Sequence, residues 1–250
     1  MKNNKADLII DRLIAAVQFA TILPFGKPGT YDPRGMISFF PVVGIILGTF
    51  VSMFDQAALL VWPKPVVSVL DVVFLIILTG AFHLDGLGDS ADGLFGHRPK
   101  DKVLSIMKDS RIGVMGLVAI ICALSVKCCG IAGIDAHRSL LLIIIPAYAR
   151  SGMLFGIIFL KYGRPEGTGY DLFKDPMKPA DFLGCLIPLV LSIFMGWKGL
   201  WLNLIFIAIT GLLIFYYKKR LGCITGDMLG AMEEITEAVL FLLMSLSIII

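Results

Sequence analysis

The sequence predicts an all-α protein: a polytopic integral membrane helical bundle with about seven membrane segments, plus an N-terminal amphipathic helix. Three observations support this fold class. Hydrophobic residues make up 57% of the 250 residues and charged residues only 16%, and the mean hydropathy is +0.87. This composition is too apolar for a water-solvated surface. Several apolar runs approach the roughly 20 residues that a membrane helix needs, and short polar stretches separate them. We therefore expect one membrane-embedded domain over residues 1–250.

The apolar runs define the expected elements in chain order. The candidate spans are residues 36–62, 66–82, 112–134, 139–160, 182–196, 200–217 and 238–250. The last run is short for a full crossing, but its helix can begin near Thr225 and carry acidic first turns at the membrane edge. One further run, residues 8–25, is interrupted by Asp11, Arg12 and Gln18. We interpret it as an amphipathic helix at the membrane interface.

The distribution of cations predicts the orientation in the membrane. The segments expected on one side are residues 1–35, 83–111, 161–181 and 218–237. They hold 17 of the 22 Lys and Arg residues. The cations expected on the opposite side are Lys64, Lys127, Arg138 and Lys198. Because cations accumulate on the cytoplasmic side of membrane proteins, the four segments are expected to face the cytoplasm. The net charge of +3 is too small to indicate nucleic-acid binding.

The densest polar feature follows the run 66–82 and contains Asp85, Asp89 and Asp92. On a helix these residues fall within an arc of about 60° and share one face. Three carboxylates so close repel one another at a membrane edge unless a cation compensates. Oxygen-only ligands favour a hard ion, Mg²⁺ or Mn²⁺. The structural alternative is a solvated loop or an acidic helix N-terminus, and the interspersed glycines weaken a regular helix.

A second acidic group lies at the start of the last expected helix and consists of Asp227, Glu233, Glu234 and Glu237. It is on the same predicted side as the three aspartates. On a helix Asp227 and Glu234 share a face, and Glu237 is adjacent to Glu234. Two acidic groups at one membrane face could hold two metal ions, or one metal ion and a general base. The alternative is a capped helix start with acidic first turns.

Four cations are candidates for binding phosphate: Lys108, Arg111, Arg150 and Arg164. Arginine binds phosphate bidentately. Because an intramembrane arginine needs a partner, Arg150 is expected to face the bundle interior and an anion or a carboxylate. For Arg111 and Arg164 the alternative is ordinary anchoring at the cytoplasmic side. Metal-binding carboxylates and arginines beside a membrane indicate phosphoryl or phosphodiester chemistry on a substrate with several negative charges.

Four motifs, in this order and spacing, resemble the cobalamin synthase family of adenosylcobinamide-GDP ribazoletransferases. They are FHLDGLGDSADG at 82–93, KDSRIG at 108–113, YxRPEGxG at 162–169, and TGDxxGA at 225–231 followed by Glu237. The resemblance covers essentially the whole chain. It implies the last step of cobalamin nucleotide-loop assembly, in a prokaryotic cytoplasmic (inner) membrane. In that step α-ribazole or its 5′-phosphate reacts with adenosylcobinamide-GDP and GMP leaves, with Mg²⁺ as the cofactor.

The resemblance also implies roles for the candidate residues. Asp85, Asp89 and Asp92 would bind the metal ion that stabilises the pyrophosphate and the leaving GMP. The four cations named above would hold phosphate oxygens. Asp227 or Glu237 would complete the metal shell or take the hydroxyl proton. The family often has Gln at the two other Glu positions of the second acidic group, which makes Glu237 the preferred candidate there.

Two other functions compete with this interpretation. A CDP-alcohol phosphotransferase also uses aspartates at the membrane face, but its longer DxxDGxxAR pattern, with two further aspartates, differs from residues 85–93. A cation-coupled transporter uses carboxylates at the bilayer midplane and often shows an inverted repeat. Here the acids cluster at one face and no repeat is visible in the sequence.

The expected partners are the two small-molecule substrates and the lipid bilayer, with a homo-oligomer left open and no nucleic acid. Three polar residues have no assigned function in this scheme. His83 alone is more typical of a satisfied interfacial histidine than of a base. Asp55 and Asp71 fall within or near spans on the far half, and the sequence offers no functional account of them.

Overall fold

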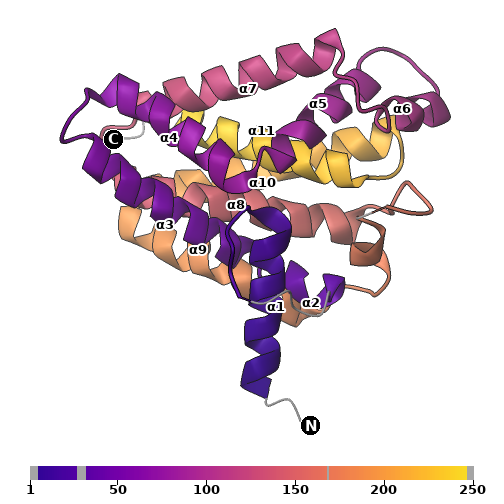
Figure 1. Ribbon diagram of the computed structural model, residues 1–250, viewed down its shortest axis with the longest axis horizontal. Helices are drawn as coiled ribbons and strands as arrows, with labels where there is room; N and C mark the ends of the chain where they lie inside the picture. Colours follow the sequence, from indigo (N-terminus) through magenta and orange to yellow (C-terminus); the bar gives the residue numbers. More distant parts are fainter. Residues whose placement is uncertain (1–4, 27–31, 168, 247–250) are drawn as a thin grey trace.

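The computed structural model describes residues 5–26, 32–167 and 169–246. Within these ranges every regular element is a helix, so the predicted fold class is confirmed (Figure 1). The α-helices are α1 (Lys5–Ala20), α2 (Pro33–Ile37), α3 (Phe40–Ala58), α4 (Lys64–Thr79), α5 (Phe82–Leu94), α6 (Lys100–Ile106), α7 (Val114–Gly133), α8 (Arg138–Phe159), α9 (Leu186–Ser192), α10 (Trp197–Arg220) and α11 (Gly226–Met244). The short 3-10 helices are η1 (Tyr170–Phe173), η2 (Pro179–Cys185) and η3 (Ile193–Met195).

Four described helices are long and apolar enough to cross a membrane: α3, α7, α8 and α10. The pair α4 and α5 makes a fifth span when it is counted as one bent crossing. The predicted run 182–196 falls in the shorter apolar segment Pro179–Met195. The run 238–250 overlaps α11, which begins at Gly226 and carries four acidic residues, and residues 247–250 lie outside the described part. Helix length and composition therefore support four or five spans, and the count of seven stays a prediction.

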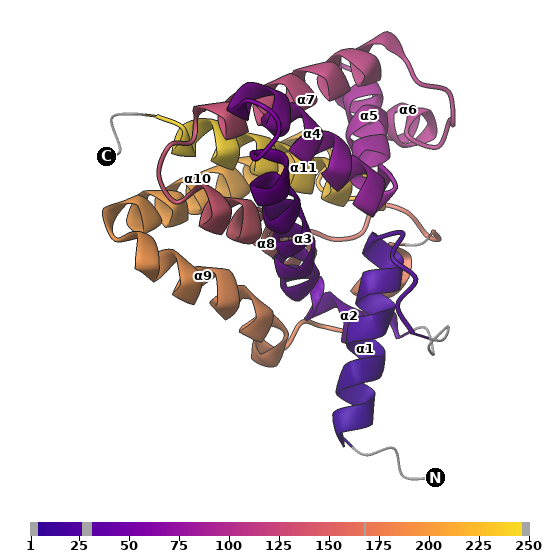
Figure 2. The same ribbon diagram turned by 60° about the vertical axis from the view of Figure 1, so that its left-hand side comes forward.

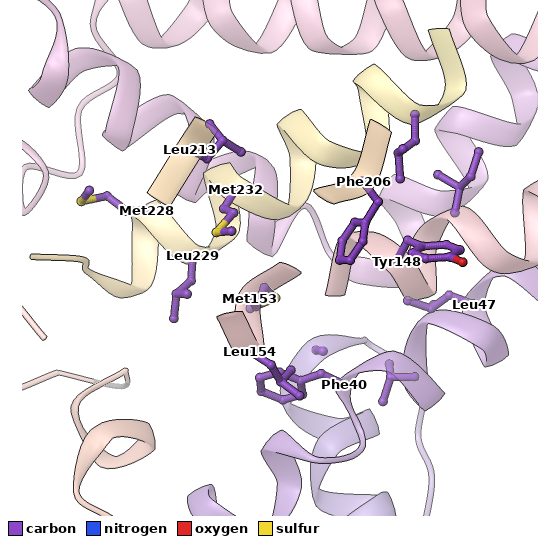
Figure 3. Packing of buried hydrophobic residues seen from close by; sticks show 14 of the residues in the cluster. Phe40, Leu47, Tyr148, Met153, Leu154, Phe206, Leu213, Met228, Leu229 and Met232 are labelled. Carbon is purple, nitrogen blue, oxygen red and sulfur yellow. The ribbon is translucent and has the colours of Figure 1, made fainter. Parts of the chain in front are cut away.

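Helix α8 forms the centre of the bundle. In the most apolar 18-residue stretch of α8, 83% of the stretch is buried inside the protein. In the corresponding stretches of α7 and α10 the buried share is 28% each. Figure 3 shows side chains of α8 between those of α3 and those of α10 and α11. Examples are Leu154 beside Phe40 and Tyr148 beside Phe206. The apolar surfaces of α7 and α10 consequently face the surroundings of the bundle, as expected of helices in contact with lipid.

Two glycines allow α3 to approach the backbone of α8. A Cβ on Gly44 would lie 2.4 Å from the Cα atom of Ala147, and one on Gly48 would lie 2.4 Å from the carbonyl oxygen of Leu142. Small residues at a helix interface permit this close approach within membranes. The predicted run 36–62 is longer than the helix, because α2 ends at Ile37 and α3 starts afresh at Phe40 with a proline in its first turn.

The chain bends by 93° between α4 and α5. Gly80 ends α4 with φ 61°, and Ala81 follows with φ 59°. Glycine reaches this left-handed conformation without a Cβ clash, so it is the common residue at such a helix end. Beyond the bend α5 packs against α7 and α11. The bend therefore ends the predicted run 66–82 near its expected boundary and aims the acidic segment at α11.

Helix α1 projects from the bundle at a steep angle in both views (Figures 1 and 2). Leu8 and Ile9 are exposed, whereas Ala16 is buried. Arg12 forms an ion pair with Asp32 at 2.8 Å, which fixes α1 to the residue that caps α2. This arrangement agrees with the predicted amphipathic helix, although the helix ends at Ala20 and not at residue 25.

Asp55 and Asp71, for which the sequence offers no function, form a buried ion-pair network with Arg138. Arg138 Nη2 lies 2.6 Å from Asp55 and 3.0 Å from Asp71. Both carboxylates are fully buried. The network joins α3, α4 and α8, and removing one partner would leave a buried charge uncompensated.

Candidate active site

The three aspartates of the DGLGDSAD segment lie on one continuous helix. Despite its glycines, α5 runs unbroken from Phe82 to Leu94. Asp85 is exposed, and Asp89 and Asp92 are half-buried. Leu87 and Leu94, on the other side of the helix, are buried. The prediction of a shared acidic face is therefore confirmed, and the apolar face of α5 anchors the helix in the bundle.

The first turn of α11 lies directly against this helix. A Cβ on Gly86 would lie 2.8 Å from the carbonyl oxygen of Asp227, and a Cβ on Gly230 would lie 3.2 Å from the Cα atom of His83. Glycine at both positions allows the two backbones to touch. As a result Asp89 interacts electrostatically with Asp85, Asp92 and Asp227. The structure thus brings together the acidic residues of two distant sequence motifs on one side of the bundle.

Arg164 supplies the positive charge nearest to Asp227. Its Nη2 atom donates a hydrogen bond to an Asp227 carboxylate oxygen at 2.6 Å. A backbone bridge positions the segment, because the Gly163 amide donates to the Ile224 carbonyl at 2.9 Å and the Ile224 amide donates to the Lys161 carbonyl at 2.9 Å. Burial raises the pKa of Asp227, and Arg164 acts in the opposite direction.

Asp92 serves a structural purpose at the start of α7. Its two carboxylate oxygens accept hydrogen bonds from the backbone amides of Gly113 at 2.6 Å and Gly116 at 2.8 Å. These amides belong to the first turn of α7, where backbone donors lack helical partners. Metal ligation by Asp92 stays a prediction, and an ion would have to compete with the two backbone donors for its oxygens.

Lys108 and Arg111 lie on the loop between α6 and α7, and Arg111 lines a cavity together with Asp92. Lys108 is 3.5 Å from Glu166, which follows Arg164 in the neighbouring loop. Arg111 donates to Asp109 from Nε at 2.9 Å and from Nη2 at 2.6 Å. These hydrogen bonds lower the pKa of Asp109 to about 2. The Arg111 side chain is 86% exposed, so a phosphate group can reach it but would compete with Asp109.

Arg150 and Glu237 lie in a separate, buried ionic cluster inside the bundle. Arg150 is 2.7 Å from Glu233 and 4.0 Å from Glu237. Lys127 donates to Glu234 at 2.6 Å and also to Glu237. Both Arg150 and Glu237 are 1% exposed. The expectation that Arg150 faces the interior and a carboxylate is confirmed, and its predicted contact with phosphate would require this cluster to open.

Lys127 is the member of this cluster that the sequence analysis does not predict. The distribution of cations predicts it on the far side of the membrane, but it is 3% exposed within α7. A single lysine inside a long apolar run was the available signal, because such a residue needs a carboxylate partner. His83 also reaches the cluster, with Nδ1 3.2 Å from Glu233.

Two acidic groups are candidates for binding a hard divalent cation, and side-chain cations already neutralise the buried group more completely. Asp85, Asp89 and Asp227 offer carboxylate oxygens with Arg164 as the neighbouring cation, a set typical of Mg²⁺ ligation. Within the described part of the chain, the group of acidic residues whose oxygens lie within 4.8 Å of one another is Glu233, Glu234 and Glu237. The Lys127 ammonium group already binds two of these carboxylates, so a lysine stands where an ion would have to bind.

Comparison with known proteins identifies the family. The sequence profile of the family described as cobalamin-5-phosphate synthase matches residues 12–245. A relative from Alkaliphilus metalliredigens is 33% identical over 241 residues, which cover 94% of this chain and 96% of that protein. One from Synechococcus elongatus is 36% identical over 239 residues, covering 92% of this chain and 94% of that protein. Both are named adenosylcobinamide-GDP ribazoletransferase, and no solved structure matches the chain. Since the match extends over nearly its whole length, the chain belongs to the cobalamin-5-phosphate synthase family.

Proposed function

We propose that this protein is a membrane-embedded transferase that joins α-ribazole, or its 5′-phosphate, to adenosylcobinamide-GDP with release of GMP. The product is adenosylcobalamin or its 5′-phosphate, and the reaction is the final step of nucleotide-loop assembly. Family membership and the names of the relatives support this activity. The structural observation that carries it is the contact between α5 and α11, which places Asp85 and Asp89 beside Asp227 and Arg164. Acids with a cation at a membrane face suit a substrate that carries a pyrophosphate.

The reaction is a single displacement at phosphorus. A hydroxyl oxygen of α-ribazole attacks the phosphorus on the cobinamide side of the pyrophosphate. The bond from this phosphorus to the bridging oxygen breaks, and GMP leaves with that oxygen. Asp227 is preferred to Glu237 for completing the metal shell or accepting the hydroxyl proton, since it lies with Asp85 and Asp89. Glu237 is ten residues further along α11, about 15 Å along the helix axis, and is bound to Lys127.

Binding and positioning of the pyrophosphate fall to the cations beside the aspartates. Arg164 already approaches Asp227, and Lys108 and Arg111 lie on the adjoining loop. Guanidinium groups hold phosphate oxygens in a fixed orientation, which matters because phosphoryl transfer depends mainly on positioning and charge stabilisation. We assign Arg150 to the buried cluster, where it orients α11 through Glu233.

Magnesium is the cofactor that we propose for this site. Asp85, Asp89 and Asp227 would hold the ion, because hard divalent cations prefer carboxylate oxygens. When bound, it would neutralise the negative charge that develops on the pyrophosphate and on the leaving GMP. Without it, the three carboxylates would repel a substrate of the same charge.

We further propose that the site faces the cytoplasm from a prokaryotic inner membrane. Asp85, Asp89, Arg164 and Asp227 all belong to the segments that hold most of the cations. Such segments remain on the cytoplasmic side. Both substrates are water-soluble, and this orientation would give them direct access.

The experiment that tests the activity compares two classes of diphosphate substrate with the purified protein in detergent micelles. Adding α-ribazole to adenosylcobinamide-GDP should release GMP in step with formation of the corrinoid product. A CDP-linked lipid precursor with an alcohol acceptor should release no CMP. Release of CMP without release of GMP would assign the protein to CDP-alcohol chemistry, and ion flux in proteoliposomes without GMP release would assign it to transport.

A further inference from the structure

An apolar groove runs along the outside of the bundle between α7 and α10. Its volume is about 450 Å³, within the roughly 300–1,000 Å³ of ligand pockets. Ala119 and Ala123 of α7 line one side, Leu213 and Tyr217 of α10 line the other, and Ala231 of α11 contributes to the floor. Both α7 and α10 pack against α11 (Figure 2). Because α7 and α10 are the least buried of the spanning helices, the groove is open to the surrounding lipid.

A basic pocket adjoins one end of this groove. It has a volume of about 620 Å³ and is lined by His97, Arg98, Pro99, Tyr216, Lys219 and Arg220, so none of the described residues that line it is acidic. Tyr216 lines both cavities, so the basic pocket lies next to the groove. Arg220 donates to the backbone carbonyls of Gly96 at 2.7 Å and Arg98 at 3.1 Å. These hydrogen bonds hold the segment after α5 against the end of α10, and so they fix the two walls of the pocket relative to each other.

We propose that the groove and the basic pocket together bind one anionic phospholipid. An acyl chain would occupy the groove, and the head-group phosphate would lie between Arg98 and Lys219. An apolar channel that opens to the bilayer and ends at a cluster of cations matches the two ends of such a lipid. Both cations belong to segments expected at the cytoplasmic side, where anionic lipids attract basic residues and fill basic pockets between helices.

A second copy of the chain fits this surface less well than a lipid does. A symmetric dimer through the groove would use the same patch on both copies. It would therefore bring two basic pockets to one edge of the interface, and like charges would face each other. The concave shape also leaves about 450 Å³ that a flat helix face would not fill.

The bound lipid would lie directly behind the acidic helix. Leu87, Ala91 and Leu94 line the groove from α5, and on a helix these positions are opposite Asp85 and Asp89. An acyl chain in the groove would thus complete the packing of α5 on the face away from the carboxylates. We expect occupancy by the lipid to stabilise the fold around α5.

The test measures lipid retention by native mass spectrometry. The full-length protein is reconstituted in vesicles of phosphatidylcholine with and without phosphatidylglycerol, and then released into detergent. The wild type should retain one phosphatidylglycerol molecule in preference to phosphatidylcholine. Arg98→Ala and Lys219→Ala should each weaken retention about fivefold, the effect of one cation near the membrane surface. Ala119→Phe, which fills the groove and keeps both cations, should also reduce retention.

Lys198→Ala is the matched control, because it removes one cation at the opposite end of α10 and should retain the lipid normally. Equal retention of both lipids by the wild type would overturn the proposal, as would unchanged retention in both cation variants. Displacement of phosphatidylglycerol by GDP would assign the basic pocket to the nucleotide and overturn it as well. A dimer that excludes lipid from the groove would have the same consequence. None of these readouts requires turnover, so they are independent of the proposed transferase activity.

Discussion

The backbone of Gly86 lies so close to the backbone of Asp227 that a Cβ at residue 86 would be 2.8 Å from the Asp227 carbonyl oxygen and 3.1 Å from its Cα atom. No flexible side chain is involved, so neither partner can move without shifting a helix. This contact joins the acidic face of α5 to the first turn of α11. The proposed active site depends on it, because the site takes its carboxylates from both helices.

Replacing Gly86 with alanine should separate these helices. We expect an at least tenfold loss of GMP release and a loss of stability of about 1–3 kcal/mol, which is typical of overpacking. Thermal unfolding and initial rates in detergent would measure both effects. Gly211→Ala in α10 is the matched control, since a Cβ there meets nothing within 4 Å and alanine favours a helix. Equal activity of the two variants would refute the role of the contact.

Arg164 should matter for substrate binding more than for folding. Removing its guanidinium group in Arg164→Ala takes away a charge-assisted contact of about 1.5–3 kcal/mol, so KM for adenosylcobinamide-GDP should rise at least tenfold. Arg164→Lys should lose less, because it keeps the charge without the bidentate geometry. Arg12→Ala, which breaks the half-buried ion pair with Asp32 between α1 and α2, should leave KM unchanged. A normal KM in Arg164→Ala would remove this residue from the site.

Asp92 offers a test that separates a helix cap from a metal ligand. Both of its oxygens accept backbone hydrogen bonds from α7. Asp92→Asn keeps one acceptor oxygen, so we expect a loss of stability of about 0.5–2 kcal/mol and an unchanged Mg²⁺ requirement. Titration of activity with Mg²⁺ would measure the latter. A large increase in the Mg²⁺ concentration needed for half-maximal activity would instead make Asp92 a ligand.

The buried cluster should respond strongly to loss of Lys127. Lys127→Met leaves Glu234 and Glu237 without their shared cation, and breaking a buried ion pair in this way costs about 3–5 kcal/mol. The double variant with Glu237→Gln should recover part of this loss, because one buried charge is then removed. Thermal unfolding of the wild type, both single variants and the double variant would report the coupling. Additive effects of the two substitutions would mean that the residues do not interact.

Sequence patterns predicted the parts of this protein that depend on local periodicity. The apolar runs located the long helices, and the spacing of Asp85, Asp89 and Asp92 indicated one helix face. Capping by Asp92 was not predictable, because it depends on where the first turn of α7 lies relative to α5. The sequence also does not predict how deep each helix lies in the bundle or how it is rotated about its own axis. The distribution of cations therefore predicts Lys127 on the far side of the membrane, and the motifs predict Arg150 and Glu237 in the active site, although the three meet inside the bundle.

We propose that aspartates of α5 and α11 hold a magnesium ion at the pyrophosphate. The most direct measurement is the dependence of GMP release on Mg²⁺ for the wild type, Asp89→Asn, and the control Asp101→Asn, which changes an exposed aspartate of α6. We predict that EDTA abolishes release, that Mg²⁺ restores it in the wild type and the control, and that Asp89→Asn stays about a hundredfold slower at saturating Mg²⁺. Near-normal turnover of Asp89→Asn, or turnover that EDTA leaves intact, would contradict the claim.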